Sequence, residues 1–258
     1  MAELRYTLEG KGPPVVLLNG LFQRLEAWDG LLPHLSGFTV LRYDMRGQGL
    51  SPMGKGPLTP ERHALDLKAL LEHLQLGKVH LVGLSNGGVV AQVFALRYPE
   101  RVGSLVLLCT TPYLDTALRA KVESWLYALE AGGTSLRIRV GLPWTFGRSF
   151  LNRHPELLLE EGLAALLAQA PPPEAQRELL LGFLKLGDLR PSLRELSLKA
   201  MVVAGEEDLL FPFPYAQALA EALRAELLSL PLGHAAPLED PGLVGQVVRK
   251  FLEVRDAV

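Results

Sequence analysis

The chain has 258 residues, a formal net charge of −2, 48% hydrophobic residues and 21% charged residues, as expected of a globular protein without a nucleic-acid partner. Its single cysteine, Cys109, excludes an intramolecular disulfide and a cysteine-based zinc cluster, and no apolar run is long enough to span a membrane. We therefore expect a cytoplasmic enzyme or binding protein built on one large α/β domain, with or without an insertion.

Short apolar runs recur along the chain and predict the strands of a sheet. Most are apolar at consecutive positions, as strands covered on both faces are. The predicted strands are 13–20, 38–44, 78–85, 102–110, 198–205 and 225–231. Helical patterns at 58–77 and 86–99 lie between them, the second ending at Pro99. Alternating strands and helices predict a mostly parallel sheet with right-handed crossovers.

The alternation of strands and helices stops once, between about residues 112 and 196. No strand pattern occurs there, and helical patterns at 116–133 and 155–170 are separated by Pro-rich and Gly-rich breaks. We expect a helical cap, 112–196, inserted into a core domain made of 1–111 and 197–258.

The segment VHLVGLSNGGVVAQ, residues 79–92, places Ser85 among glycines where a predicted strand turns into a predicted helix. Spacing excludes a phosphate-binding loop, because the glycines at 83, 87 and 88 fit neither G-x-G-x-x-G nor G-x-x-x-x-G-K-[ST]. Residues 83–87 do fit G-x-S-x-G, a sharp turn that requires glycine two positions before and after the serine. The helix N-terminus then supplies N–H groups that favour an oxyanion. The sequence predicts a nucleophilic Ser85.

A nucleophilic serine needs a base to take its proton and an acid to orient that base. Both partners are expected after the serine, each in a loop that follows a strand. Asp208 follows the strand predicted at 198–205, and His234 follows the strand predicted at 225–231. The alternative for His234 is a turn residue. The five other histidines of the six lie in helical or edge contexts, so we expect Asp208 and His234 to complete the set.

Five segments together resemble the α/β-hydrolase superfamily: VVLLNGL, LRYDMRGQGLS, GLSNGG, GEEDLLFP and GHAAPLEDP. The resemblance covers nearly the whole chain and is strongest to the capped branch that includes 3-oxoadipate enol-lactonases, carboxylesterases and meta-cleavage C–C hydrolases. It implies a mostly parallel sheet of the eight-stranded type, flanked by helices. It also implies Ser85 as nucleophile, His234 as general base and acid, and Asp208 as its orienting partner. The oxyanion hole would use the backbone N–H groups of Leu21 and Asn86.

Some positions around these motifs leave alternatives open. Many members of the superfamily carry histidine where this chain has Asn19, but the oxyanion donor is a backbone N–H, so the change need not abolish catalysis. Asp115 is a rival to Asp208, because some relatives place the acid after the preceding strand. Asp208 is the better match. Asp44 and Arg46 are typical of the superfamily and are expected to brace loops.

The cap is expected to select the substrate. The candidates for an apolar acyl pocket are Phe22, Trp28, Trp125, Trp144 and Phe146, together with Phe150; packing between cap helices is the alternative for each. The candidates to hold a substrate carboxylate are Arg137, Arg139, Arg148 and Arg153, with solvated surface charge as the alternative.

The resemblance implies two-step acyl transfer, and we expect hydrolysis of small to medium carboxylic esters or lactones without a cofactor or a metal ion. C–C bond hydrolysis and perhydrolysis with the same triad are alternatives, as is a non-catalytic ligand-binding protein of this fold. The expected partner is a small-molecule ester or lactone, with no nucleic acid and no membrane, and the chain is expected to be a monomer or a homo-oligomer.

Overall fold

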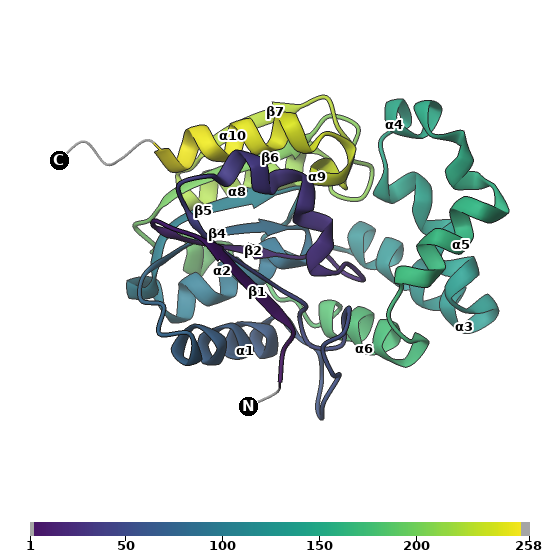
Figure 1. Cartoon of the computed structure of the whole chain (residues 1–258). Helices are drawn as coiled ribbons and strands as arrows, with labels where there is room; N and C mark the ends of the chain where they lie inside the picture. Colours follow the sequence, from purple (N-terminus) through teal and green to yellow (C-terminus); the bar gives the residue numbers. More distant parts are fainter. Residues whose placement is uncertain (1–2, 254–258) are drawn as a thin grey trace.

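The computed structural model describes residues 3–253, and its centre is a seven-stranded sheet of order β1-β3-β2-β4-β5-β6-β7 (Figure 1). The strands are β1 Tyr6–Gly10, β2 Pro14–Leu18, β3 Thr39–Tyr43, β4 Val79–Leu84, β5 Val102–Leu108, β6 Lys199–Gly205 and β7 Glu226–Leu230. β1 runs antiparallel to β3, and all other neighbouring strands are parallel. The predicted α/β class with a mostly parallel sheet is confirmed, but the sheet has seven strands where the eight-stranded type was expected.

Each of the predicted strand segments contains a strand, from β2 to β7. The sequence does not predict β1, the only strand of the described chain that precedes β2. β1 lies at the edge of the sheet, where Tyr6 and Leu8 remain 38% and 41% exposed. An edge strand need not be apolar at consecutive positions, so β1 lacks the pattern that marks the buried strands.

Helices cover both faces of the sheet. Side chains alternate along each strand, so strands that are apolar at consecutive positions present apolar side chains on both faces, and both must be buried. Val16 and Leu18 of β2 belong to the core on one face, and Val15 and Leu17 belong to the core on the other. The first core lies under α1 Pro60–His73, α2 Asn86–Arg97 and α8 Phe213–Leu223; the second lies under the 3₁₀ helix η1 Leu25–Leu35 and α10 Pro241–Glu253. Figure 1 shows α10 and α1 on opposite sides of the sheet.

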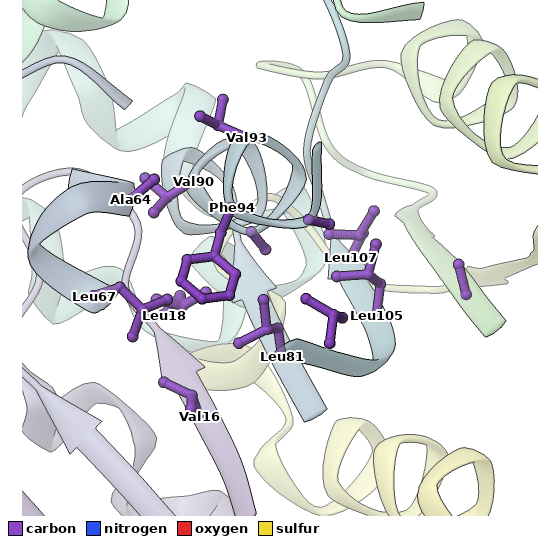
Figure 2. Close-up of a cluster of buried hydrophobic side chains, with 14 of the residues drawn as sticks. Val16, Leu18, Ala64, Leu67, Leu81, Val90, Val93, Phe94, Leu105 and Leu107 are labelled. Carbon is purple, nitrogen blue, oxygen red and sulfur yellow. The ribbon is translucent and has the colours of Figure 1, made fainter. Parts of the chain in front are cut away.

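The first core is built around α2, which is buried along nearly its whole length. Figure 2 shows Ala64 and Leu67 of α1 and Val90 and Phe94 of α2 packed over Val16, Leu18, Leu81, Leu105 and Leu107 of the central strands, whereas Val93 lies on the other side of α2. This packing holds the N-terminus of α2 directly at the end of β4. The short helices of the core are η2 Pro99–Arg101 and α9 Ala236–Glu239.

Between β5 and β6 the described chain contains helices and no strand. They are α3 Thr116–Thr145, α4 Arg148–Arg153, η3 Pro155–Leu158, α5 Glu160–Gln169, α6 Pro173–Phe183 and α7 Arg190–Leu193. Figure 1 shows α3, α4, α5 and α6 grouped beside the sheet. The predicted helical insertion is therefore confirmed, whereas its domain boundaries at 112 and 196 stay predictions. No helix within residues 3–253 has the length and apolar character to cross a membrane.

Two of the helices predicted in the insertion differ from the expected ones. The helix expected to end at residue 133 kinks at Gly132 and Gly133 and continues to Thr145 as part of α3. Gly133 has a φ of 67°, a conformation that costs glycine little, so the chain changes direction without ending the helical segment. The helix expected over 155–170 is divided at Leu159, which is extended, into η3 and α5.

Candidate active site

Ser85 occupies the sharp turn between β4 and α2. Its φ of 55° and ψ of −121° lie in a region that L side chains rarely adopt. A Cβ placed on Gly87 would lie 2.1 Å from the Leu18 carbonyl oxygen, and one on Gly83 would lie 2.5 Å from the Gly87 carbonyl oxygen. Both glycines are therefore required by close backbone contacts, and the tightly packed turn maintains the strained serine.

A continuous hydrogen-bonded chain joins Ser85, His234 and Asp208. His234 Nε2 lies 2.9 Å from Ser85 Oγ, and His234 Nδ1 lies 2.9 Å from Asp208 Oδ2. A carboxylate only accepts, so His234 Nδ1 carries the proton and Nε2 accepts from the serine hydroxyl. All three side chains are buried. The arrangement can remove a proton from Ser85 and pass it to another group.

Asp208 and His234 are positioned by the loops after β6 and β7. Asp208 Oδ1 accepts hydrogen bonds from the backbone N–H groups of Leu210 at 2.9 Å and Phe211 at 2.8 Å, which orients Oδ2 toward His234. The Phe211 ring meets the His234 ring edge-on, with centroids 5.0 Å apart. The histidine is therefore fixed by a hydrogen bond on one side and by an aromatic contact on another.

The loop after β2 lies against the Ser85 turn. A Cβ placed on Gly20 would lie 3.4 Å from Ser85 Cβ, so Gly20 is a direct neighbour of the serine. The predicted oxyanion donor Leu21 is the next residue along the chain. Asn86, the other predicted donor, is the first residue of α2. Within residues 3–253, neither of these two backbone N–H groups donates to another atom of the chain. Both N–H groups therefore remain available to a ligand.

The Asn19 side chain holds the start of this loop in place through two hydrogen bonds. Its side-chain oxygen accepts from Trp28 Nε1 at 2.7 Å, and its side-chain nitrogen donates to the Tyr43 carbonyl oxygen at 3.3 Å. The side chain is completely buried. The amide thus ties the end of β2 to β3 and η1, which explains how an asparagine serves at this position.

Ser85 and His234 open into a cavity of about 280 Å³ between the sheet and the insertion. We call the core residues that line it, 20–24, 26–27, 84–85, 210–211, 234–235 and 238, the cavity floor. The insertion residues that line it, on α3, α5 and α6 and the segments that follow α3 and α5, are the cavity roof; they include Val122, Trp125, Arg137, Leu142 and Phe183. The lining is mainly apolar, as in pockets that bind small organic molecules.

A family model described as alpha/beta hydrolase fold matches residues 13–241. The chain belongs to the α/β-hydrolase family. It is 27% identical to 3-oxoadipate enol-lactonase 2 of Acinetobacter baylyi, over 97% of this chain and 93% of the relative. It is 35% identical to a pimeloyl-[acyl-carrier protein] methyl ester esterase of Methylococcus capsulatus, over 85% of each chain. A thermophilic esterase from Thermogutta terrifontis, solved with malate bound, superposes with a TM-score of 0.86 at 30% identity, covering 96% of this chain and 92% of the other.

These relatives support the reaction class that the resemblance implied. Enol-lactonases, carbamate hydrolases and esterases of the α/β fold are all related to this chain, so a hydrolase is supported. The names of these relatives differ in the bond that is cleaved, an enol-lactone, a carbamate or a methyl ester.

Three of the five aromatic residues predicted to bind substrate line the cavity: Phe22, Trp125 and Phe146. The prediction is wrong for Trp28, which lies under the Asn19 loop with 1% of its surface exposed and donates its N–H to Asn19. It is also wrong for Trp144, which packs outside the cavity against the Lys121 ammonium. Phe150 likewise stacks on Phe146 without lining the cavity.

The structure separates the four candidate arginines. Only Arg137 lines the cavity. Arg139 is exposed and pairs with Glu160 at 2.6 Å, and Arg148 and Arg153 are exposed on α4. Solvated surface charge is therefore the correct interpretation for all but Arg137.

The remaining acidic and basic candidates brace the fold. Asp115 caps α3 by accepting from Leu118 N at 2.8 Å, and it also accepts from Tyr215 Oη at 2.8 Å; its hydrogen bonds do not include His234. Asp44 accepts from the backbone N–H groups of Leu25 and Leu50. Arg46 forms a two-point pair with Asp66.

Sequence reasoning missed the packing residues of the site, above all Phe211 against His234 and Phe183 in the roof. Phe211 stands three positions after Asp208, so its place in the acid loop was the available signal. No such signal marks Phe183, because an apolar residue on a helix is ordinary core. Among residues 3–253, no group of three or more His, Cys, Asp or Glu side chains is placed to hold a metal ion.

Proposed function

We propose that the chain is a serine hydrolase that cleaves carboxylic ester or lactone bonds of small to medium substrates, with Ser85 as nucleophile, His234 as general base and acid, and Asp208 as its orienting partner. The observation that carries the proposal is the pair of 2.9 Å contacts linking Ser85, His234 and Asp208 at the edge of an apolar cavity. The relatedness to enol-lactonases and esterases gives it further support.

In the first step, Ser85 Oγ attacks the substrate carbonyl carbon while His234 Nε2 takes the hydroxyl proton. The carbonyl π electrons move to oxygen, and the resulting oxyanion accepts from the N–H groups of Leu21 and Asn86. The positive end of α2 favours the same charge. Asp208 keeps the proton on Nδ1, so Nε2 is free to act as the base.

In the second step, His234 gives its proton to the leaving alkoxide, the carbon–oxygen bond breaks, and an acyl group remains on Ser85. Water then attacks the acyl carbon while His234 Nε2 takes one of its protons. Collapse of the second tetrahedral intermediate releases the acid, and the proton returns to Ser85 Oγ. In a lactone the leaving alkoxide stays attached to the acyl chain, so one hydroxy acid is released.

The proposal is tested by labelling with a fluorophosphonate probe, which reacts with activated serines. The native protein is expected to be labelled, and Ser85→Ala is expected to stay unmodified. Ser104→Ala is the matched control, because Ser104 Oγ also lies 2.8 Å from a histidine nitrogen, His80 Nδ1, but on the regular strand β5. Labelling that persists in Ser85→Ala and disappears in Ser104→Ala would overturn the assignment.

A substrate panel decides which bond is cleaved. It contains p-nitrophenyl esters of graded chain length, several lactones including an enol-lactone, a carbamate and a vinylogous diketone. We expect ester or lactone turnover, lost in Ser85→Ala. Preference for the diketone would move the function to C–C cleavage by the same residues, and no turnover together with no labelling would favour a ligand-binding role. A reaction without cofactor, the cytoplasmic location and the choice between monomer and homo-oligomer stay predictions from the sequence.

A further inference from the structure

Arg137 is a buried charge without a counter-charge. It lies on α3 with 7% of its surface exposed. The other arginines and aspartates that are buried within residues 3–253 form ion pairs: Arg42 with Glu9 and Asp29, Arg46 with Asp66, Asp44 with Arg5, and Asp208 with His234. No carboxylate of the described chain pairs with Arg137. A buried, unpaired guanidinium is costly, so its presence needs a reason.

The guanidinium of Arg137 is held in one orientation. Its Nε donates to Gln176 Oε1 at 2.6 Å, and the Gln176 amide nitrogen in turn donates to Thr134 Oγ1 at 2.9 Å and to the Pro171 carbonyl oxygen at 2.6 Å. Its carbon lies 4.2 Å from the centre of the Phe22 ring. The two terminal nitrogens donate to no atom within residues 3–253. Side-by-side terminal N–H groups are the fork that binds a carboxylate at two points.

The free end of Arg137 belongs to the same cavity as Ser85 and His234. Phe22, on which it stacks, follows Leu21 in the loop beside the serine. Burial lowers the pKa of Arg137 to about 10, so the side chain is still positively charged at neutral pH. The cavity lining has one carboxylate, Glu26, and that carboxylate already accepts from Arg5 and Arg24. The cavity therefore carries positive charge that is not neutralised.

We propose that Arg137 binds a carboxylate carried by the substrate, so that the enzyme prefers esters or lactones whose acid chain ends in a second negative charge. The inference rests on the proposed function of Ser85 and names the substrate class of that site. With a cavity of about 280 Å³, the class is that of half-esters of short dicarboxylic acids and lactones of similar size that bear a carboxylate. The binding energy of the remote carboxylate positions the scissile carbonyl at Ser85.

The test compares two esters of equal shape. p-Nitrophenyl hemiglutarate carries a terminal carboxylate, and p-nitrophenyl 5-methylhexanoate carries an isopropyl group in its place. We expect the native enzyme to have a kcat/KM about 10- to 100-fold higher for the hemiglutarate, as a charge-assisted pair in a partly dry site provides. Hemisuccinate and hemiadipate esters then give the chain length that the separation of Arg137 and Ser85 selects.

Variants at Arg137 separate binding from packing. In Arg137→Gln the preference for the charged ester is expected to collapse, mainly through KM, and inhibition by free glutarate is expected to weaken in parallel. Arg137→Lys keeps the charge without the fork and is expected to retain part of the preference. Arg139→Gln, an exposed neighbour outside the cavity, is the matched control and should behave as the native enzyme.

Each outcome bears on a different part of the proposal. Equal kcat/KM for the two esters in the native enzyme, or an Arg137→Gln protein that loses both activities in the same proportion, would show that Arg137 only packs the cap, and would leave the serine hydrolase intact. No turnover of either ester, together with no fluorophosphonate labelling of Ser85, would overturn the proposed function itself.

Discussion

The floor and the roof of the cavity are built in different ways. The floor residues stand at the ends of β2, β4, β6 and β7 or in the segments that follow them, and the carboxyl ends of these parallel strands meet at one edge of the sheet. The roof residues are side chains on the faces of α3, α5 and α6, which gather over that edge. The floor brings reactive groups together through backbone geometry, and the roof adds shape and charge through helix packing.

The two parts also differ in how tightly they are held. The floor contains backbone contacts that admit no extra atom, such as the approach of Gly87 to the Leu18 carbonyl oxygen. The end of α3 and the segment that leads from it to α4 are joined to the core by hydrogen bonds. In one of them, Ala235 N donates to the Thr145 carbonyl oxygen at 2.8 Å. We infer that the reacting groups belong to the floor, and that substitutions in the roof reduce the stability of the fold less than substitutions in the floor do.

The largest expected effect tests the chemistry of the floor. Asp208→Asn keeps the shape of the acid but places an amide opposite His234, which favours the wrong tautomer of the ring. By analogy with serine protease triads, kcat is expected to fall by about 10⁴, measured with p-nitrophenyl esters. Asp115→Asn is the matched control, because an asparagine oxygen can still accept from Leu118 N and Tyr215 Oη. A larger loss of kcat in Asp115→Asn than in Asp208→Asn would show that the acid is Asp115, after β5, and not Asp208, after β6.

The second prediction tests how little space the floor allows. In Gly87→Ala the new methyl group would lie 2.1 Å from the Leu18 carbonyl oxygen, a backbone atom that cannot turn aside as a flexible side chain could. We expect the free energy of unfolding to fall by more than about 3 kcal/mol, measured by urea denaturation. Gly77→Ala is the control, since no atom lies within 4 Å of its added carbon, and it should change stability by less than about 0.5 kcal/mol. Equal losses in the two variants would contradict the close contact.

The same division decides what the sequence could predict. The elbow at Ser85 and the two loop residues Asp208 and His234 are local patterns at the ends of strands, so their approach in space follows from the parallel sheet. The position of Arg137 depends on the kink at Gly132 and Gly133, which turns the second half of α3. No local pattern distinguishes a kinked helix from a helix that ends.

The aromatic candidates show the same limit. Trp125 and Trp144 lie on opposite sides of the kink in α3, and only Trp125 lines the cavity. Which side of each half faces the cavity depends on the direction of that half and on how its neighbours pack. Trp28 is close to the oxyanion loop along the chain, which is why the sequence predicts it in the pocket. In the structure its buried N–H donates to the Asn19 side-chain oxygen, and this contact holds the ring under the loop. Burial of a polar atom is a property of the folded neighbourhood, which periodicity does not contain.

The smallest expected effect concerns the joint between floor and roof. Glu239 Oε1 accepts from Gly147 N at 3.0 Å, just before α4, and Glu239 Oε2 accepts from Gly233 N at 2.8 Å, just before His234. In Glu239→Gln one oxygen becomes an NH₂ group that cannot accept, so one of these N–H groups loses its partner. We expect a loss of about 1–3 kcal/mol in the free energy of unfolding and faster hydrogen exchange at Gly147 and Gly233. Glu206→Gln changes an exposed acid and should change neither quantity. Unchanged exchange at Gly147 and Gly233 in Glu239→Gln would mean that the two Glu239 hydrogen bonds do not hold the roof to the floor.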